Sequence, residues 1–119
     1  MDASGRPIFL QLAEQLENQI ISGQLASESQ VPSTNELAAF HRINPATALK
    51  AINQLVDEGT LFKKRGIGMF VSQGARQTLL QKHGIKFQAE FVAPLVAEAK
   101  KLGISNQEII QMLERESDS

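Results

Sequence analysis

The sequence predicts a mainly α-helical fold with one small β-hairpin, divided into a domain over residues 1–72 and a helical extension over residues 73–119. Within the domain, apolar residues recur at steps of three and four in several segments, which is the spacing of amphipathic helices. Two short apolar runs, residues 60–64 and 69–72, flank a glycine-containing turn and predict the hairpin. In the extension the helical pattern becomes longer.

Composition restricts the class of protein. The chain has 119 residues, a formal net charge of −1 and 42% hydrophobic residues, which suits one small domain with an appendage. It has no cysteine, so disulfides and thiolate metal sites are excluded and a reducing compartment is favoured. The apolar runs stay well below the ~20 residues of a membrane span, and the N-terminus lacks a signal-peptide pattern. We expect a cytoplasmic protein that makes no membrane contact.

The first helix is predicted within residues 7–25. Pro7 suits a helix start, and Gly23 supplies a left-handed stop. Its buried face is marked by apolar residues at steps of four: Ile8, Leu12, Leu16 and Ile20. The opposite face, which we expect to contact solvent, carries Glu14, Glu17 and Asn18.

The second helix is predicted to open with a capping box. Ser33 and Glu36 have the spacing at which a hydroxyl and a carboxylate each bind a backbone N–H of the helix start. Leu37 and Phe40 then offer apolar contacts. We expect this helix to end near residues 41–42.

The third helix is predicted to begin at Asn44 and Pro45. Asn44 can cap the helix, and Pro45 fits the first helical position because that position needs no N–H donor. Gly59 ends the helix. The inward face is expected to carry Ala48, Ala51, Ile52, Leu55 and Val56. The outward face is expected to carry Ala46, Thr47, Lys50 and Gln54.

Two short helices, a tight turn and a following hairpin form the winged helix-turn-helix arrangement, whose geometry suits DNA. A helix about 10–12 Å across fits a major groove about 12 Å wide. The entering end needs small or hydrogen-bonding residues, and Asn44, Ala46 and Thr47 meet that need. Lys50 lies one turn later, and the positive end of the helix dipole also favours phosphate.

The hairpin tip concentrates positive charge. Lys63, Lys64 and Arg65 precede a slim Gly66–Ile67–Gly68 turn, and an arginine there suits the negative potential of a minor groove. Lys63 and Lys64 alternate along a strand, so only one of them, assigned as Lys64, is expected to face DNA. Residues 1–72 hold six Lys or Arg against seven Asp or Glu, so binding to a polyanion must depend on local placement.

The extension is predicted to hold two helices. Pro94 should kink or interrupt the first, Gly103 ends it, and Ser105 with Glu108 forms a capping box for the second. Because two helices cannot bury their own apolar face, we expect a second copy of the chain to cover it. The alternative is that this face lines an effector pocket. The face assigned to dimerisation comprises Leu80, Phe87, Phe91, Val92, Leu95, Leu102, Ile109 and Leu113.

The sequence does not favour an enzyme or a metal site. His41 is expected in a half-buried slot and His83 at the surface, with no cysteine to complete a metal site. Asp57–Glu58 precede a helix-ending glycine without a partner histidine, and Ser33 has no nucleophile pattern around it. We therefore expect no catalytic residue, no metal and no cofactor.

The stretches PIFLQLAEQL, SGQL, VPSTNELA, INPATALKAINQLVDEG and KKRGIGMFV closely resemble the DNA-binding domain of GntR-family bacterial transcription regulators, over residues 7–71 without gaps. The short helical extension is similar to that of the YtrA-type branch. The resemblance implies a dimerisation role for the extension and a regulator that is most often a repressor. Members of this branch often regulate genes for membrane transporters.

The same resemblance assigns DNA contacts. This sequence departs from many relatives at three places: they have tyrosine in place of Phe9, arginine in place of Asn35 and Leu-Gly in place of His41–Arg42. We expect Arg42 to gain a phosphate contact as a result of the last difference. The DNA-contacting set is expected to be Ser33, Thr34, Asn35, Arg42, Asn44, Ala46, Thr47, Lys50, Lys64, Arg65, Gly66, Ile67 and Gly68.

Two functional hypotheses follow from the sequence. The first is a homodimeric transcriptional repressor that binds an inverted-repeat operator in double-stranded DNA, with no effector identified. The second is a winged-helix protein–protein interaction module without DNA binding, which the mildly acidic composition favours slightly.

Overall fold

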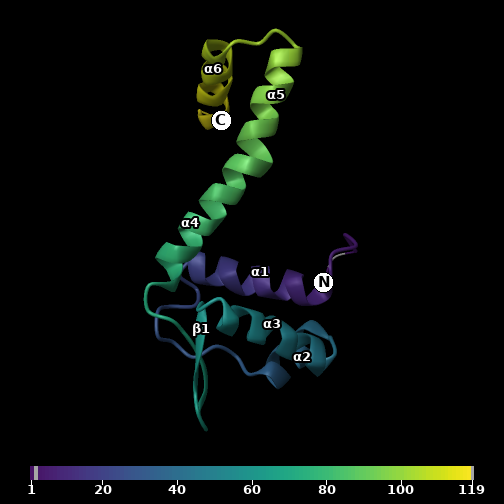
Figure 1. The fold of residues 1–119 in the computed structure, drawn as a ribbon, viewed down its shortest axis with the longest axis vertical. Helices are drawn as coiled ribbons and strands as arrows, with labels where there is room; N and C mark the ends of the chain where they lie inside the picture. The colour runs from purple at the N-terminus through teal and green to yellow at the C-terminus, as the bar shows by residue number, and fades with distance from the viewer. Residues whose placement is uncertain (2, 119) are drawn as a thin grey trace. The chain divides into compact units, whose positions relative to one another are not determined.

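Figure 1 shows the computed structural model of the chain, which describes residue 1 and residues 3–118. Two compact units are present, residues 1–80 and residues 81–119. The predicted mainly helical fold with one small hairpin is confirmed. A functional division at residue 72 stays a prediction. No helix within the described residues is long and apolar enough to span a membrane.

The first unit is a winged helix-turn-helix. Its elements in chain order are α1 (Ile8–Ile21), α2 (Thr34–His41), α3 (Pro45–Asp57), β1 (Leu61–Lys64), β2 (Gly68–Val71) and the beginning of α4 (Ala75–Phe87). The predicted helix ends are confirmed at α1 and α3, because Gly23 and Gly59 follow them in the left-handed region with φ of 86° and 79°.

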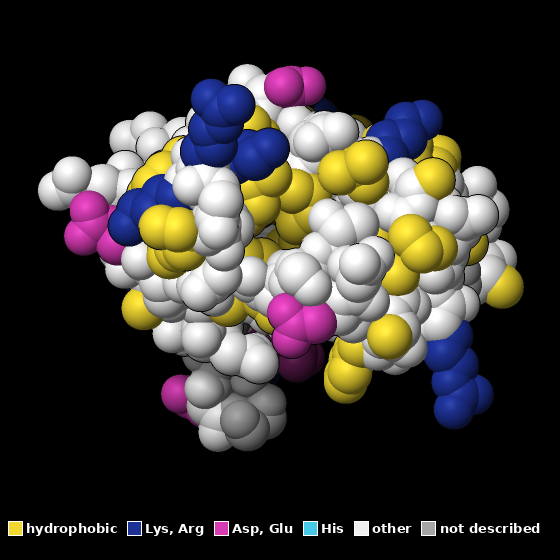
Figure 2. Space-filling model, turned by 90° about the horizontal axis from the view of Figure 1, so that it is seen from below, with side chains coloured by type: hydrophobic (Ala, Val, Ile, Leu, Met, Phe, Trp, Pro, Cys, Tyr) yellow, Lys and Arg dark blue, Asp and Glu magenta, His cyan; other side chains and the backbone are white. Residues whose placement is uncertain are grey.

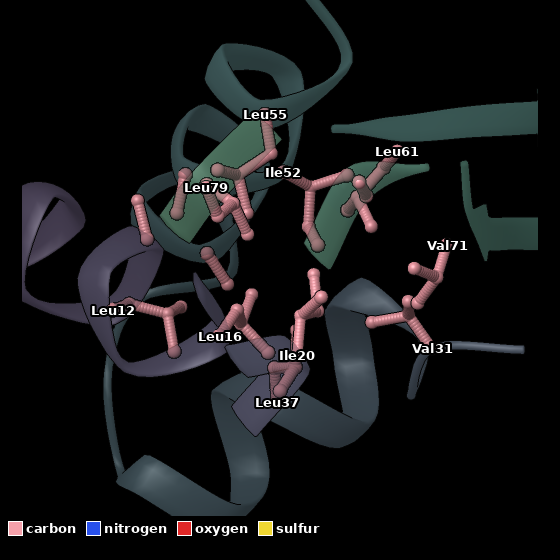
Figure 3. Packing of buried hydrophobic residues seen from close by; sticks show 14 of the residues in the cluster. Leu12, Leu16, Ile20, Val31, Leu37, Ile52, Leu55, Leu61, Val71 and Leu79 are labelled. Carbon is pink, nitrogen blue, oxygen red and sulfur yellow. The ribbon is translucent and has the colours of Figure 1, made fainter. Parts of the chain in front are cut away.

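The core of this unit forms where α1, α3 and the hairpin meet, as the labelled side chains in Figure 3 show. Burying one such aliphatic side chain contributes about 1.5–3 kcal/mol, so this cluster fixes the orientation of α3 against α1. Its fully buried large members are Leu12, Leu16, Ile20, Ile52, Leu55, Leu61, Val71 and Leu79. Leu79 lies in α4, so the start of that helix packs with the first unit.

The hairpin pairs its strands antiparallel, with Leu61 opposite Val71 and Phe62 opposite Phe70. Leu61 and Val71 are buried on the core side, whereas Phe62 and Phe70 stack on the other side with ring centroids 5.8 Å apart. Residues 28–31 run along β2 and bond to it through three backbone hydrogen bonds of 2.9–3.0 Å. The hairpin is therefore held against the body of the domain by backbone bonds to β2 and by the burial of Leu61 from β1 and Val71 from β2.

Three side-chain placements differ from the prediction. Ile8, predicted on the buried face of α1, is 45% exposed, because it is the first residue of the helix and lies at the edge of the core. Glu17 is buried, with 5% of its surface exposed, because it lies one turn from the buried Ala13 and Ile20 and shares their sector of α1. Phe40, predicted to make apolar contacts, is 81% exposed, and its ring forms a T-shaped contact with the half-buried His41, with the ring centroids 5.0 Å apart. Helical spacing places a residue on a face, but an adjacent element must cover that face.

The second unit contains the end of α4, a π-helical turn η1 (Gln88–Val92), α5 (Ala93–Lys101) and α6 (Asn106–Ser117). The predicted interruption at Pro94 is confirmed and takes the form of this π-turn. Ala93 N–H donates to Gln88 C=O, a spacing of five residues. The wider turn accommodates a residue that lacks an N–H and whose ring would crowd the preceding turn. The Ser105–Glu108 capping box is also present, with bonds of 3.1 and 3.2 Å.

Candidate nucleic-acid interface

The start of α2 presents hydrogen-bond donors at the surface. Ser33 Oγ accepts Glu36 N–H at 3.1 Å, and Glu36 Oε1 accepts Ser33 N–H at 2.9 Å. Hydrogen bonds to the Glu36 carboxylate from the Ser33 backbone N–H, and to a lesser extent from the Ser33 side chain, lower the pKa of Glu36. Thr34 and Asn35 occupy the first two helical positions, whose N–H groups have no acceptor inside a helix. The helix start can therefore donate to an anion while the cap holds the Glu36 carboxylate in place.

The turn between α2 and α3 has an unusual backbone. Arg42 follows α2 with φ 55° and ψ 50°, the left-handed conformation that glycine adopts after α1, α3 and α5. Its N–H and that of Ile43 both donate to Ala38 C=O, the latter at 3.0 Å, so the turn is well defined. A non-glycine residue in this region carries a cost of about 1–2 kcal/mol. The exposed arginine thus occupies a position where glycine would fit better.

The start of α3 is confirmed as a capped helix end. Asn44 Oδ1 accepts Ala46 N–H at 2.8 Å, and Pro45 is the first helical residue. The outward stripe differs slightly from the prediction, because Thr47 and Gln54 are half-buried flanks. The exposed stripe of α3, which we call the α3 outer stripe, comprises Ala46, Leu49, Lys50 and Asn53.

Leu49 and Asn53 were missing from the predicted set, although their position on the stripe could have been found from spacing. Residues at i, i+3, i+4 and i+7 share one helix face. Counted from Ala46, these are the four members of the α3 outer stripe. Lys50 extends toward α1, where its ammonium lies 4.1 Å from the centroid of the Phe9 ring. Phe9, noted in the sequence as a tyrosine replacement, therefore orients a basic residue of the stripe through a cation–π contact.

The hairpin tip carries the other predicted contacts. Lys63, Arg65, Gly66 and Ile67 are exposed, and Gly66 has φ 79°. The Lys64 ammonium lies 4.4 Å from the Phe70 ring centroid, which holds its charge over the outer face of the hairpin. One contact was not foreseeable: Gln30 Nε2 donates to Ile67 C=O at 3.1 Å, across 37 residues of sequence. No local sequence pattern signals such a bond.

Figure 2 shows the end of the molecule that bears the hairpin tip. Lys and Arg side chains gather on the left, over the hairpin, and stand singly on the right, with exposed hydrophobic side chains between them. The hairpin itself, residues 60–72, contains no acidic residue. A locally basic hairpin therefore adjoins a mixed polar and apolar helix face in a domain whose overall charge is close to zero.

The second unit holds a separate apolar groove of about 480 Å³. Of the residues predicted for dimerisation, it brings together Phe87, Phe91, Val92, Leu95, Ile109 and Leu113. Val96, Asn106 and Ile110 complete the groove and were not predicted. Leu102 is 64% exposed and does not line the groove, and Leu80 belongs to the first unit. Phe87 and Phe91 are 58% and 62% exposed, with ring centroids 5.5 Å apart.

Known structures share this fold. A transcriptional regulator of the GntR family from Bacteroides thetaiotaomicron matches 93% of this chain and 96% of its own, with 31% identity and a TM-score of 0.80. The DNA-binding domain of AraR, solved in complex with operator ORX1, matches 56% of this chain and 81% of its own, with 31% identity and a TM-score of 0.54.

Curated relatives agree with the structural matches. The transcriptional regulator YhcF of Bacillus subtilis is 26% identical over 91% of this chain and 88% of its own length. The transcriptional repressor YtrA of the same organism is 33% identical over 66% of this chain, and the match spans 60% of YtrA. Residues 9–71, over half of the chain, match the profile described as bacterial regulatory proteins, gntR family. The chain therefore belongs to the GntR family of bacterial transcription regulators.

Proposed function

We propose that this protein is a YtrA-type repressor that binds an inverted-repeat operator as a homodimer. The observation that carries the proposal is the α3 outer stripe, which is exposed beside a basic, glycine-flanked hairpin tip. The opposite face of α3 is buried in the core, so the α3 outer stripe is the face that can enter a major groove. The DNA-binding domain of AraR, which has the same fold and was solved in complex with operator DNA, supports this use of the fold.

The α3 outer stripe offers chemistry suited to base edges. The Asn53 amide can donate and accept, which matches the N6 and N7 atoms of adenine, and the Lys50 ammonium matches the acceptors of guanine. Ala46 and Leu49 supply apolar contacts that suit the thymine methyl group. We assign base reading to this stripe, and its mixture of polar and apolar groups gives a preference that phosphate contacts alone cannot provide.

Backbone contacts position the domain on DNA. The Ser33 hydroxyl accepts Glu36 N–H at 3.1 Å and is exposed at the helix start, where it can contact a phosphate oxygen. Thr34 and Asn35 add backbone N–H donors at the positive end of α2. Arg42, exposed in the following turn, supplies a charge-assisted contact. These groups explain how a nearly neutral domain can bind phosphate.

The apolar groove of the second unit supports a homodimer. It exposes two phenyl rings and several aliphatic side chains that water covers poorly. A second copy seated there by two-fold symmetry would bury both grooves together. Two α3 helices related by that axis would meet half-sites about one helical turn or more apart. The resemblance to the YtrA-type branch, whose members often regulate genes for membrane transporters, adds the expectation that the target genes are of this kind.

Selection of bound sequences from a random duplex library tests the proposal. The purified protein should enrich an inverted repeat, and binding to that duplex should fall steeply with salt because phosphate contacts release counterions. Asn53→Ala should weaken binding roughly tenfold and relax the preference at one position of each half-site. Gln24→Ala, on an exposed loop away from the interface, is the matched control. Enrichment of no common motif would contradict sequence-specific binding.

A further inference from the structure

An isoleucine stands alone at the tip of the hairpin. Ile67 is 64% exposed, between Gly66 at φ 79° and Gly68 at φ 146°. Neither neighbour has a side chain, and an added Cβ at Gly66 would meet nothing within 4 Å. Among residues 65–68, all of which the structure describes, Ile67 therefore supplies the one bulky apolar side chain, and that side chain is exposed.

The tip is held in place from outside the hairpin. Gln30 Nε2 donates to Ile67 C=O at 3.1 Å, and Gln30 itself is bridged to Phe70 in β2. A Cβ on Gly68 would lie 2.6 Å from the same Gln30 nitrogen, so a larger residue at this position would displace the Gln30 amide from the hairpin tip. The turn has its own backbone bond, from Ile67 N–H to Lys64 C=O at 2.9 Å, and the Gln30 side chain adds a second bond to the carbonyl that precedes the last glycine. Ile67 is thus presented in a preset position.

The surroundings of Ile67 identify the surface that it meets. Lys63, Lys64 and Arg65 precede it, and the hairpin holds no acid. Basic side chains at a slim tip are attracted by the negative potential of a narrow minor groove. An isoleucine gains nothing from phosphate, which a lysine or serine would contact better. Apolar side chains at minor-groove contacts act instead by entering between base steps, partly unstacking them and bending the duplex.

We infer that Ile67 is a wedge that enters the minor groove of the operator and bends it, with Gln30 as the positioning residue that holds the tip. This inference rests on the proposed function and adds a structural consequence to it. The base step under the tip would be a flexible pyrimidine–purine step, because such steps unstack most easily. Specificity would then extend to positions where no side chain reads a base edge.

Energy transfer between dyes on the two ends of a duplex measures the bend. The probe is the duplex recovered from a random library by the wild-type protein, and transfer should rise when that protein binds. Ile67→Ala should bind about tenfold more weakly, since the apolar insertion is lost, and should abolish most of the rise. Ile67→Leu should keep the rise, because leucine is also a wedge-forming residue. Since Ile67 is exposed, its variants should melt like the wild type.

A second probe separates bending from unstacking. A 2-aminopurine placed at the step under the tip should become brighter with the wild type and with Ile67→Leu, but not with Ile67→Ala. Gln30→Ala should give a smaller rise in energy transfer at saturating protein, and an unchanged rise would remove the role assigned to Gln30. Equal energy transfer for wild type and Ile67→Ala, both bound to the recovered duplex, would overturn the wedge while leaving operator binding intact. Failure of the wild type to recover any duplex would instead overturn the proposed function.

Discussion

Replacing Arg42 by glycine is expected to stabilise the fold and to weaken DNA binding at the same time. Arg42 adopts φ 55° and ψ 50°, where a residue with a Cβ costs about 1–2 kcal/mol relative to glycine. Glycine loses more backbone freedom on folding than arginine does, and this entropic cost reduces the stabilisation by about 0.5–1 kcal/mol. The net stabilisation lies within about 0–1.5 kcal/mol, and its central value of about 0.75 kcal/mol should raise the melting temperature of a domain of this size by roughly 3–6 °C.

The alanine variant separates the backbone from the charge. Arg42→Ala keeps a Cβ in the left-handed region and removes the guanidinium, so its melting temperature should stay close to that of the wild type. Both variants should lose the same phosphate contact. Each should therefore bind the selected duplex more weakly and show a salt slope smaller by about one per subunit.

Thermal melting followed by circular dichroism and a salt-dependent gel-shift titration are the two assays. If Arg42→Gly melted no higher than Arg42→Ala, the backbone cost assigned to this turn would be wrong. If both variants bound like the wild type at every salt concentration, the arginine would make no phosphate contact. The strained position would then lack a functional explanation.

Three further outcomes are expected. Phe91→Asp should convert dimers to monomers in sedimentation and should lower operator affinity as well. Gln111→Asp, on the opposite face of α6, should change neither the oligomeric state nor the affinity. If Phe91→Asp remained a dimer, the interface would lie elsewhere. Because the folded pKa of Glu36 is lowered, its contribution to stability is present above the usual carboxylate pKa and lost as the pH falls through the folded value. Melting temperature against pH should therefore fall more in acid for the wild type than for Glu36→Gln, and parallel curves would contradict this linkage. Gly68→Ala should weaken operator binding, since its Cβ would displace the Gln30 amide from the hairpin tip; unchanged affinity would show that this contact does not matter for binding.

Local chemistry explains what could be predicted from the sequence. The Ser33–Glu36 box, the Asn44 cap and the left-handed Gly59 are signals confined to a few residues, and the structure contains each of them. The hairpin was likewise predicted from two apolar runs and a glycine-containing turn. Pro94 indicated an interruption, and the structure adds that a π-turn accommodates it.

What could not be predicted depends on contacts between distant residues. The bond from Gln30 to Ile67 spans 37 residues and has no counterpart in any local spacing. Glu17 was assigned to solvent because charged residues usually are, yet its neighbours on α1 bury it. Phe40 was assigned to packing because its spacing is helical, yet no adjacent element covers it. Periodicity identifies residues that share a face, and only the tertiary arrangement decides whether that face is buried.

The distribution of charge explains how a protein with a net charge of −1 can bind a polyanion. The proposed phosphate contacts are concentrated at the start of α2, in the turn at Arg42 and at the hairpin tip, where these residues are mostly exposed. The carboxylate closest to them in sequence, Glu36, is bound by Ser33 N–H and is thereby held at the helix start. Local placement thus outweighs the overall charge, since screening limits the reach of the remaining acidic residues to about 8–10 Å.

Hydroxyl-radical footprinting of the selected duplex tests the central claim most directly, namely that the α3 outer stripe and the hairpin tip of two subunits meet DNA together. The account predicts two symmetry-related protected segments about one helical turn or more apart. Each should be flanked by minor-groove protection that weakens in the Ile67→Ala complex. A single unsymmetrical footprint, or protection unaffected by Asn53→Ala and Ile67→Ala, would contradict it.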